Sequence, residues 1–148
     1  MVRLKCGGLL VLALSVTAVG CSNDSVATST NPTPVTIVET FTGTLTVNGG
    51  VTHPFIASAS GTVDVTITSL ADSNGPAASG VDGTIRIGLQ LGTWNGTACY
   101  IPTAYNENAY VSTVMSLRVT GAGTLCARVY DSGRLTEPVD FEVTVSHP

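Results

Sequence analysis

The heptapeptide that decides the fold is Thr62-Val63-Asp64-Val65-Thr66-Ile67-Thr68. Its aliphatic side chains alternate strictly with polar ones, so in an extended chain they all point to one face. A helix would spread them around its axis, because helical neighbours recur every three or four residues. The heptapeptide therefore predicts a β-strand with one face in a hydrophobic core and the other in water.

The same alternation recurs along the chain, at 85–91 and again at 141–145. Past Val35 we find no stretch with helical spacing, and Gly-rich or Asn-rich turns separate the extended runs; Asn48-Gly49-Gly50 is typical of a hairpin. The expected strands lie near 36–47, 51–59, 62–70, 84–91, 97–102, 110–119, 124–130 and 138–146. About eight short strands predict an all-β fold, a two-sheet antiparallel sandwich of jelly-roll type.

Size and charge narrow the class of protein further. A chain of 148 residues suits one domain. Past Gly20, four arginines stand against ten acidic residues and there is no lysine. Such an acidic body repels phosphate backbones, so nucleic acid is excluded as an expected partner.

The amino terminus has the features of an export signal of lipoprotein type, which we place at 1–20. A basic head is followed by an apolar run too short to span a bilayer, and then by Ala18-Val19-Gly20-Cys21. This ending resembles the bacterial lipobox, in which the cysteine is lipidated, although Ala18 departs from the usual Leu. Ordinary signal cleavage is the alternative. Lipidation of Cys21 is favoured because it removes an otherwise unpaired thiol from an oxidising compartment.

The segment 21–35 is rich in Ser, Thr, Asn and Pro and is predicted to be a flexible tether to the sandwich domain at 36–148. The expected location is outside the cytoplasm, with a lipid anchor as the only contact with the membrane. Ser22 follows the cysteine where inner-membrane retention signals carry Asp, so an outer membrane is the expected destination, on its periplasmic or cell-surface side.

Two cysteines remain in the domain, Cys99 and Cys126, in separate predicted strands. An oxidising compartment favours a disulfide between them, closing a loop of 27 residues. A metal site would need more soft ligands than these two supply.

Two segments carry a family resemblance: Phe41-Thr42-Gly43-Thr44-Leu45 with the turn that follows it, and Gly123-Thr124-Leu125-Cys126-Ala127-Arg128-Val129-Tyr130. This pattern resembles the bacterial pre-peptidase C-terminal domain. The resemblance covers most of 39–147 and implies a jelly-roll sandwich that acts as a secreted accessory module. The chain departs from the family at 85–89, where an Asp-Leu-Asp-Leu-like strand is common, and at Leu125, where an aromatic is common.

Catalytic chemistry is not predicted. His53 precedes a proline at a strand start, and His147 is the penultimate residue, where we expect the chain to fray. The loop residues Asp72, Asn74 and Asp82 offer oxygen ligands for calcium, the one cofactor considered, but turn chemistry explains them equally well.

The remaining functional signal is a group of aromatics around one predicted loop region: Trp94, Tyr100, Tyr105 and Tyr110. Flat rings at the edge of a sandwich suit stacking on sugars or anchoring a peptide, whereas a single Trp is often a packing residue. We therefore expect a non-enzymatic exported lipoprotein that carries an interaction module for a protein or glycan partner. The alternative is a carbohydrate-binding module that uses these loop aromatics.

Overall fold

The computed structural model describes residues 35–74 and 84–148. The expected signal peptide, Cys21, all of the tether except Val35, and Asp82 lie outside these residues. The described part of the chain contains no helix long and apolar enough to cross a membrane.

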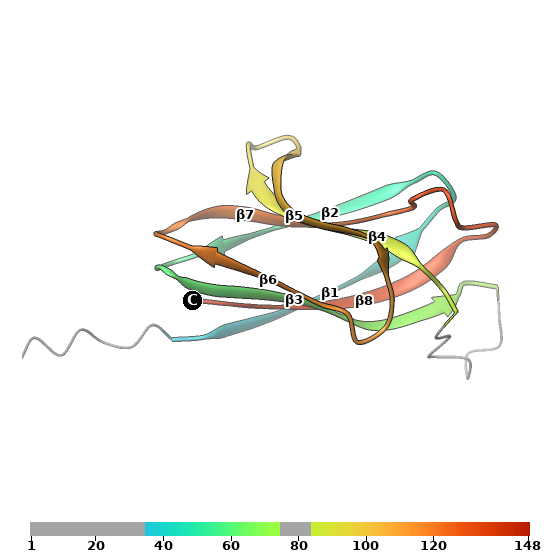
Figure 1. Ribbon diagram of the computed structural model, residues 1–148, viewed down its shortest axis with the longest axis horizontal. Helices are drawn as coiled ribbons and strands as arrows, with labels where there is room; N and C mark the ends of the chain where they lie inside the picture. The colour runs from blue at the N-terminus through green and yellow to red at the C-terminus, as the bar shows by residue number, and fades with distance from the viewer. Residues whose placement is uncertain (1–34, 75–83) are drawn as a thin grey trace, which may run out of the picture. The chain divides into compact units, whose positions relative to one another are not determined.

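Eight antiparallel strands make up the described part of the domain, in two layers (Figure 1). They are β1 (Ile37–Leu45), β2 (Gly50–Ala57), β3 (Gly61–Asp72), β4 (Ile87–Trp94), β5 (Cys99–Ala109), β6 (Val114–Val119), β7 (Gly123–Tyr130) and β8 (Val139–His147). One sheet has the order β1-β8-β3-β6 and the other β2-β7-β4-β5. This confirms the predicted all-β, two-sheet sandwich, and the alternation of strands between sheets is that of a jelly roll.

The predicted hairpin at Asn48–Gly50 is wrong. β1 pairs with β8 and β2 pairs with β7, so this turn crosses from one sheet to the other. Asn48 takes the left-handed conformation that the turn needs (φ 56°), which explains its turn-like sequence. Among successive strands of the described chain, only β4 and β5 are neighbours in one sheet.

The heptapeptide lies in β3, and its alternation is what builds the core. Val63, Val65 and Ile67 are fully buried between the sheets. They pack in one cluster with inward residues of both sheets, including Leu89 and Val143. Burial of these side chains, at about 25 cal/mol per Å² of apolar surface, is the main force that holds the two layers together.

The bounds of three strands differ from those predicted by three residues or more. The strand predicted at 110–119 begins only at Val114, as β6, because Tyr110 and Thr113 are joined by a turn hydrogen bond. β4 runs on to Trp94 and β5 to Ala109, three and seven residues past the expected ends at 91 and 102. The pairing of these strands contains three register shifts. Each bulge inserts a residue and moves later side chains to the opposite face, so strict period two is lost in the sequence although the strands continue.

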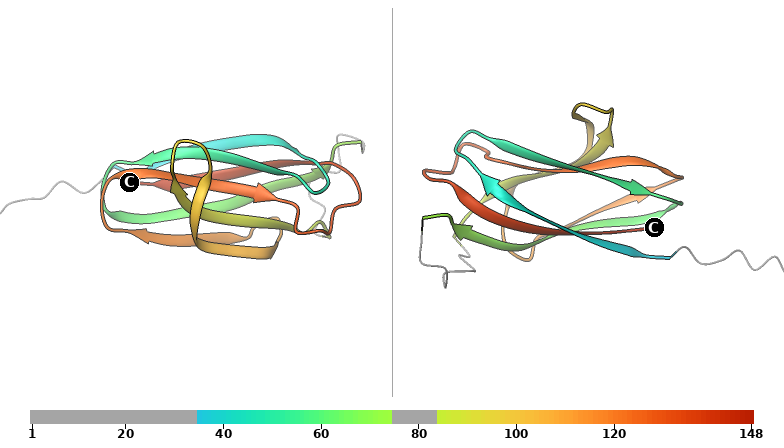
Figure 2. Two further views of the ribbon diagram at one scale, coloured as in Figure 1. Left: turned by 90° about the horizontal axis from the view of Figure 1, so that it is seen from above. Right: turned by 180° about the vertical axis from the view of Figure 1, so that it is seen from behind.

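The tip of the β4–β5 hairpin leaves its sheet and folds over the sheet's outer face. We call residues 93–100 the arm; Figures 1 and 2 show it rising from the layer. β4 lies between β5 and β7, and two strand spacings are about 9.5 Å. The Cα atoms of Cys99 and Cys126 are nevertheless only 5.6 Å apart, joined by the predicted disulfide. The arm therefore crosses above Gly92 of β4, which lacks a side chain that would block it, and is fixed to β7.

Candidate binding face

The outer face of the β1-β8-β3-β6 sheet carries many short hydroxyl side chains and acidic groups, together with Val38, Val114 and Arg118. Thr40, Thr144 and Thr66 form one row in register across three strands. The carboxylates of this face accept hydrogen bonds from neighbouring hydroxyls: Thr44 donates to Asp140, Thr68 to Glu142 and Ser116 to Asp64. A face of mutually satisfied short side chains is typical of a solvated surface.

The outer face of the β2-β7-β4-β5 sheet is different. The register places Thr52, Arg128, Gln90 and Tyr105 in one row, with one residue from each of the four strands. Inward residues alternate with them, for example Val129 and Leu89, which are fully buried. The row therefore points outward, and it contains long side chains with an aromatic ring, a guanidinium and an amide.

Tyr130 also points outward and stands in the neighbouring row, two residues along β7 from Arg128. It is opposite Gly50 on one side and Gly88 on the other. A Cβ at Gly88 would clash with three carbons of the Tyr130 ring, so the ring covers this glycine closely. The guanidinium of Arg128 lies over Gly50 in the same way, and its central carbon is 5.1 Å from the centroid of the Tyr130 ring. Two glycines thus let two planar groups lie low on the sheet.

Two residues of β5, Glu107 and Tyr105, affect the pKa of the Tyr130 hydroxyl. Burial raises the pKa of the Tyr130 hydroxyl, and the nearby Glu107 carboxylate raises it further, with a smaller contribution from Tyr105. Arg128 acts in the opposite direction. The Tyr130 hydroxyl is therefore protonated at neutral pH and can donate a hydrogen bond. We call the six residues of this surface the platform: Thr52, Gln90, Tyr105, Glu107, Arg128 and Tyr130.

The arm borders the platform on one side. The Cys126–Gly92 pair, over which the arm is fixed, is the next outward pair along the strands from Arg128 and Gln90. Because Cys126 points outward and is still fully buried, the arm covers it directly. The platform and the arm together form a step, in which the platform is the floor and the arm is the wall beside it.

The four aromatics predicted as a ligand site do not form one cluster. Tyr105 lies on the platform and is 67% exposed, whereas Trp94 and Tyr100 lie on the arm. Tyr110 lies just past β5, and the central guanidinium carbon of Arg86 lies 4.5 Å from the centroid of its ring. Trp94 is half-buried and is not part of the core cluster.

Five of the six platform residues were not identified from the sequence: Thr52, Gln90, Glu107, Arg128 and Tyr130. The sequence signal for Arg128 and Tyr130 was their outward position in the alternation of β7. At outward positions, the strands of the other sheet carry many threonines and serines. A second signal was Gly88, a glycine within a strand pattern, which marks the close approach of another group.

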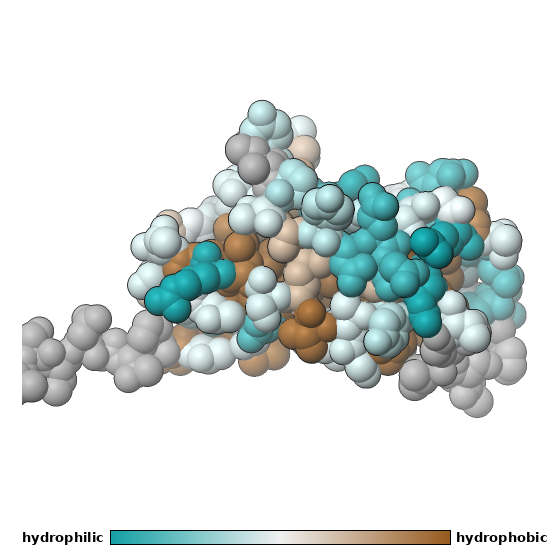
Figure 3. Space-filling model, viewed as in Figure 1, coloured by the Kyte–Doolittle hydropathy of each residue, from teal (hydrophilic) through white to brown (hydrophobic). Residues whose placement is uncertain are grey.

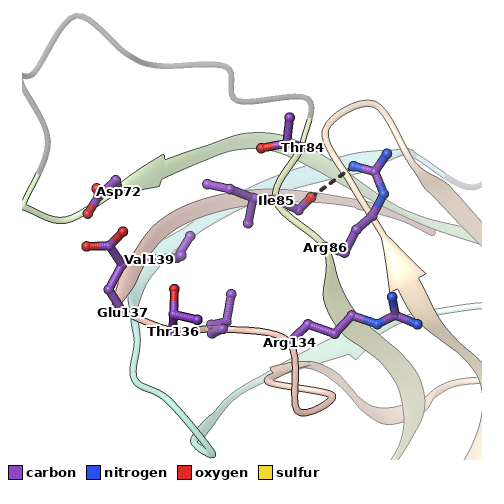
Figure 4. A pocket seen from close by; sticks show the side chains of 9 residues that line it. Asp72, Thr84, Ile85, Arg86, Arg134, Thr136, Glu137 and Val139 are labelled. Atoms are coloured by element: carbon purple, nitrogen blue, oxygen red, sulfur yellow. Dashed lines mark hydrogen bonds between the residues drawn. The ribbon is translucent and has the colours of Figure 1, made fainter.

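A separate cavity of about 380 Å³ lies at the end of the sandwich that holds the start of β4 and the β7–β8 connection. Asp72 and Glu137 line one side, and Arg86 and Arg134 the other (Figure 4). The space-filling view shows strongly hydrophilic side chains gathered toward this end (Figure 3). We assign this cavity no ligand.

Calcium binding at Asp72, Asn74 and Asp82 stays a prediction. The Asp72 carboxylate accepts the backbone N–H of Asn74 at 2.9 Å, the turn interaction offered as the alternative. Over 35–74 and 84–148, no three acidic, histidine or cysteine side chains gather as metal ligands would.

Both histidines point into the sandwich. His53 stacks on Phe41 with ring centroids 4.7 Å apart. His147 is buried, and its Nε2 lies 2.9 Å from a Glu39 carboxylate oxygen. The expected fraying at His147 is wrong, because the residue ends β8 and is paired with β1.

Comparison with known proteins adds little beyond the fold. No family model and no curated protein matches the chain. Among solved structures, it is similar to PliG of Aeromonas hydrophila, a periplasmic inhibitor of g-type lysozyme. The identity is 17% and the TM-score 0.49, over 74% of this chain and 84% of that one. This likeness carries no argument about partners, and membership of the pre-peptidase C-terminal family stays a prediction.

Proposed function

We propose that this protein is an exported, non-enzymatic binding module that presents the platform to a partner, with its amino-terminal segment as the tether. The observation that carries the proposal is the contrast between the two outer faces. One is crossed by the row Thr40, Thr144, Thr66 and Val114, and the other by the row Thr52, Arg128, Gln90 and Tyr105. Guanidinium, amide and aromatic groups gathered on one face can stack on a partner and hydrogen-bond to it, which supports a binding role there.

The absence of catalysis is part of the proposal. The two imidazoles, which are the usual general bases, face the interior against Phe41 and Glu39. The platform itself offers a carboxylate, Glu107, but this side chain is exposed on a sheet face, whereas hydrolytic sites hold their reacting groups in a water-excluding hollow.

Export and anchoring rest on the residues before the domain. The sequence of the first twenty residues and Cys21 support a lipoprotein signal. Several acyl chains on Cys21 would hold the protein on a membrane without crossing it. Mass spectrometry of the mature protein from its own cells tests this directly. We expect an acylated Cys21 at the amino terminus, and a Cys21→Ser variant that appears in the soluble fraction. An unmodified Cys21 in the mature protein would contradict lipid anchoring.

The binding role is tested with the full exported chain carrying Cys21→Ser, so that no lipid enters the assay. The probe is the cell-envelope fraction of the parent organism, and the readout is co-sedimentation. Tyr105→Ala and Arg128→Ala are expected to weaken binding at least tenfold.

Matched controls are Tyr110→Ala and Arg118→Ala, which remove the same side-chain types from places outside the platform. They are expected to bind as the unaltered chain does. Equal binding by the platform variants and their controls, or no binding by the unaltered chain, would refute the proposed role of this face.

A further inference from the structure

We infer that the partner of the platform is a neutral, hydroxyl-rich polysaccharide, bound with its chain along the foot of the arm. This inference rests on the proposed binding role of the platform and adds the chemical class of the ligand.

The chemistry of the side chains is the first argument. Tyr105 offers an open aromatic surface, and sugar rings stack their C–H faces on such rings. The same surface carries donors and acceptors: the guanidinium of Arg128 donates, the carboxylate of Glu107 accepts, and the amide of Gln90 does both. Adjacent hydroxyls of a pyranose need both donors and acceptors at fixed spacing, and this set supplies both.

The shape of the surface is the second argument. The row from Thr52 to Tyr105 spans three strand spacings, about 14 Å. The arm rises beside it, because the disulfide fixes the arm over Cys126. A protein partner needs a broad contact of roughly 800 Å² on each side, and the step interrupts such a surface. A linear polymer fits along the step and touches both the floor and the wall.

Charge is the third argument. The outer face of the opposite sheet carries Asp64, Asp140 and Glu142 together with one arginine, Arg118, and so is acidic. The platform carries one cation and one anion, Arg128 and Glu107, which cancel. A surface without net charge does not select a polyanion by long-range attraction, so local hydrogen bonding and stacking decide what binds. This favours uncharged sugars over acidic polymers.

The test separates the ligand class from the binding role. The full exported chain with Cys21→Ser is mixed with envelope fractions treated in two ways: digested with protease, or oxidised with periodate, which cleaves adjacent hydroxyl pairs. We expect binding to survive protease and to be lost after periodate.

A direct measurement follows by calorimetry with deproteinised, uncharged envelope polysaccharide. We expect binding that Tyr105→Ala weakens at least tenfold and Tyr110→Ala leaves unchanged, with equal melting temperatures showing that both variants are folded. Loss of binding after protease, with periodate harmless, would overturn the polysaccharide and assign a protein partner while leaving the platform's role intact. Selective binding to acidic polymers would also overturn the inference. Insensitivity to the platform variants would instead refute the proposed function itself.

Discussion

Replacing Asp131 with Asn should destabilise the domain, because the Asp131 carboxylate accepts hydrogen bonds from two connections between strands. Its Oδ2 accepts the N–H of Asn48, in the turn between β1 and β2, at 2.8 Å. Its Oδ1 accepts the N–H groups of Gly133, Arg134 and Leu135, in the β7–β8 connection, at 2.8, 2.8 and 3.1 Å. An Asn side chain keeps one acceptor oxygen and turns an NH₂ group toward the Asn48 donor.

The magnitude follows from these contacts. A hydrogen bond to a charged group contributes about 1.5–3 kcal/mol when buried, and less here because Asp131 is partly exposed. We therefore expect Asp131→Asn to lower the free energy of unfolding by about 1–2 kcal/mol. For a domain of this size, that lowers the Tm by roughly 4–8 °C.

The pH dependence gives a second, independent check. Burial acts to raise the pKa of the Asp131 carboxyl, but the four backbone N–H donors outweigh it and lower the pKa below the ordinary 3.8. A carboxylate with a lowered pKa in the folded state stabilises the protein above its unfolded pKa, and this stabilisation is lost as pH falls below it. The stability gap between the unaltered chain and Asp131→Asn should thus be constant from pH 7 to about 4 and shrink below that.

The assay is urea unfolding followed by circular dichroism between pH 7 and pH 2.5. Asp64→Asn is the matched control, because the Asp64 carboxylate accepts a hydroxyl hydrogen bond on the sheet surface and holds no turn. It should change stability by less than about 0.5 kcal/mol. Equal effects of the two substitutions, or a gap for Asp131→Asn that stays unchanged to pH 2.5, would refute the reasoning.

Three further predictions concern the rest of the domain. Removal of the disulfide in a Cys99→Ala/Cys126→Ala variant should cost about 3.5 kcal/mol for its 27-residue loop, and calorimetry showing an unchanged Tm would contradict this. Gly88→Ala should cost about 1–3 kcal/mol by displacing the Tyr130 ring, and the cost should vanish in a Tyr130→Ala background; a persistent cost in the double variant would place the strain elsewhere. Burial lowers the pKa of His53, so stability should fall as pH drops below about 6.5; a His53→Phe variant should lose this dependence, and identical pH profiles would show that His53 is not its source.

Much of the fold could be predicted because burial leaves a direct mark on the order of residues. In β3 and β8 the alternation of aliphatic and polar side chains is unbroken, and both strands were placed to within a few residues. The disulfide was also predictable, since export and the count of remaining cysteines left one pairing. Where bulges break the alternation, in β4 and β5, the predicted ends were wrong by up to seven residues.

The candidate site was less predictable, and the reason is physical. Local sequence determined that the chain forms paired strands and which of its side chains face the core, and it left Trp94 open between packing and ligand binding. It did not determine which strands become neighbours, because pairing depends on contacts between residues far apart in the chain. Only the tertiary structure brings β2, β7, β4 and β5 side by side, and only this places Thr52, Arg128, Gln90 and Tyr105 in one row beside the arm.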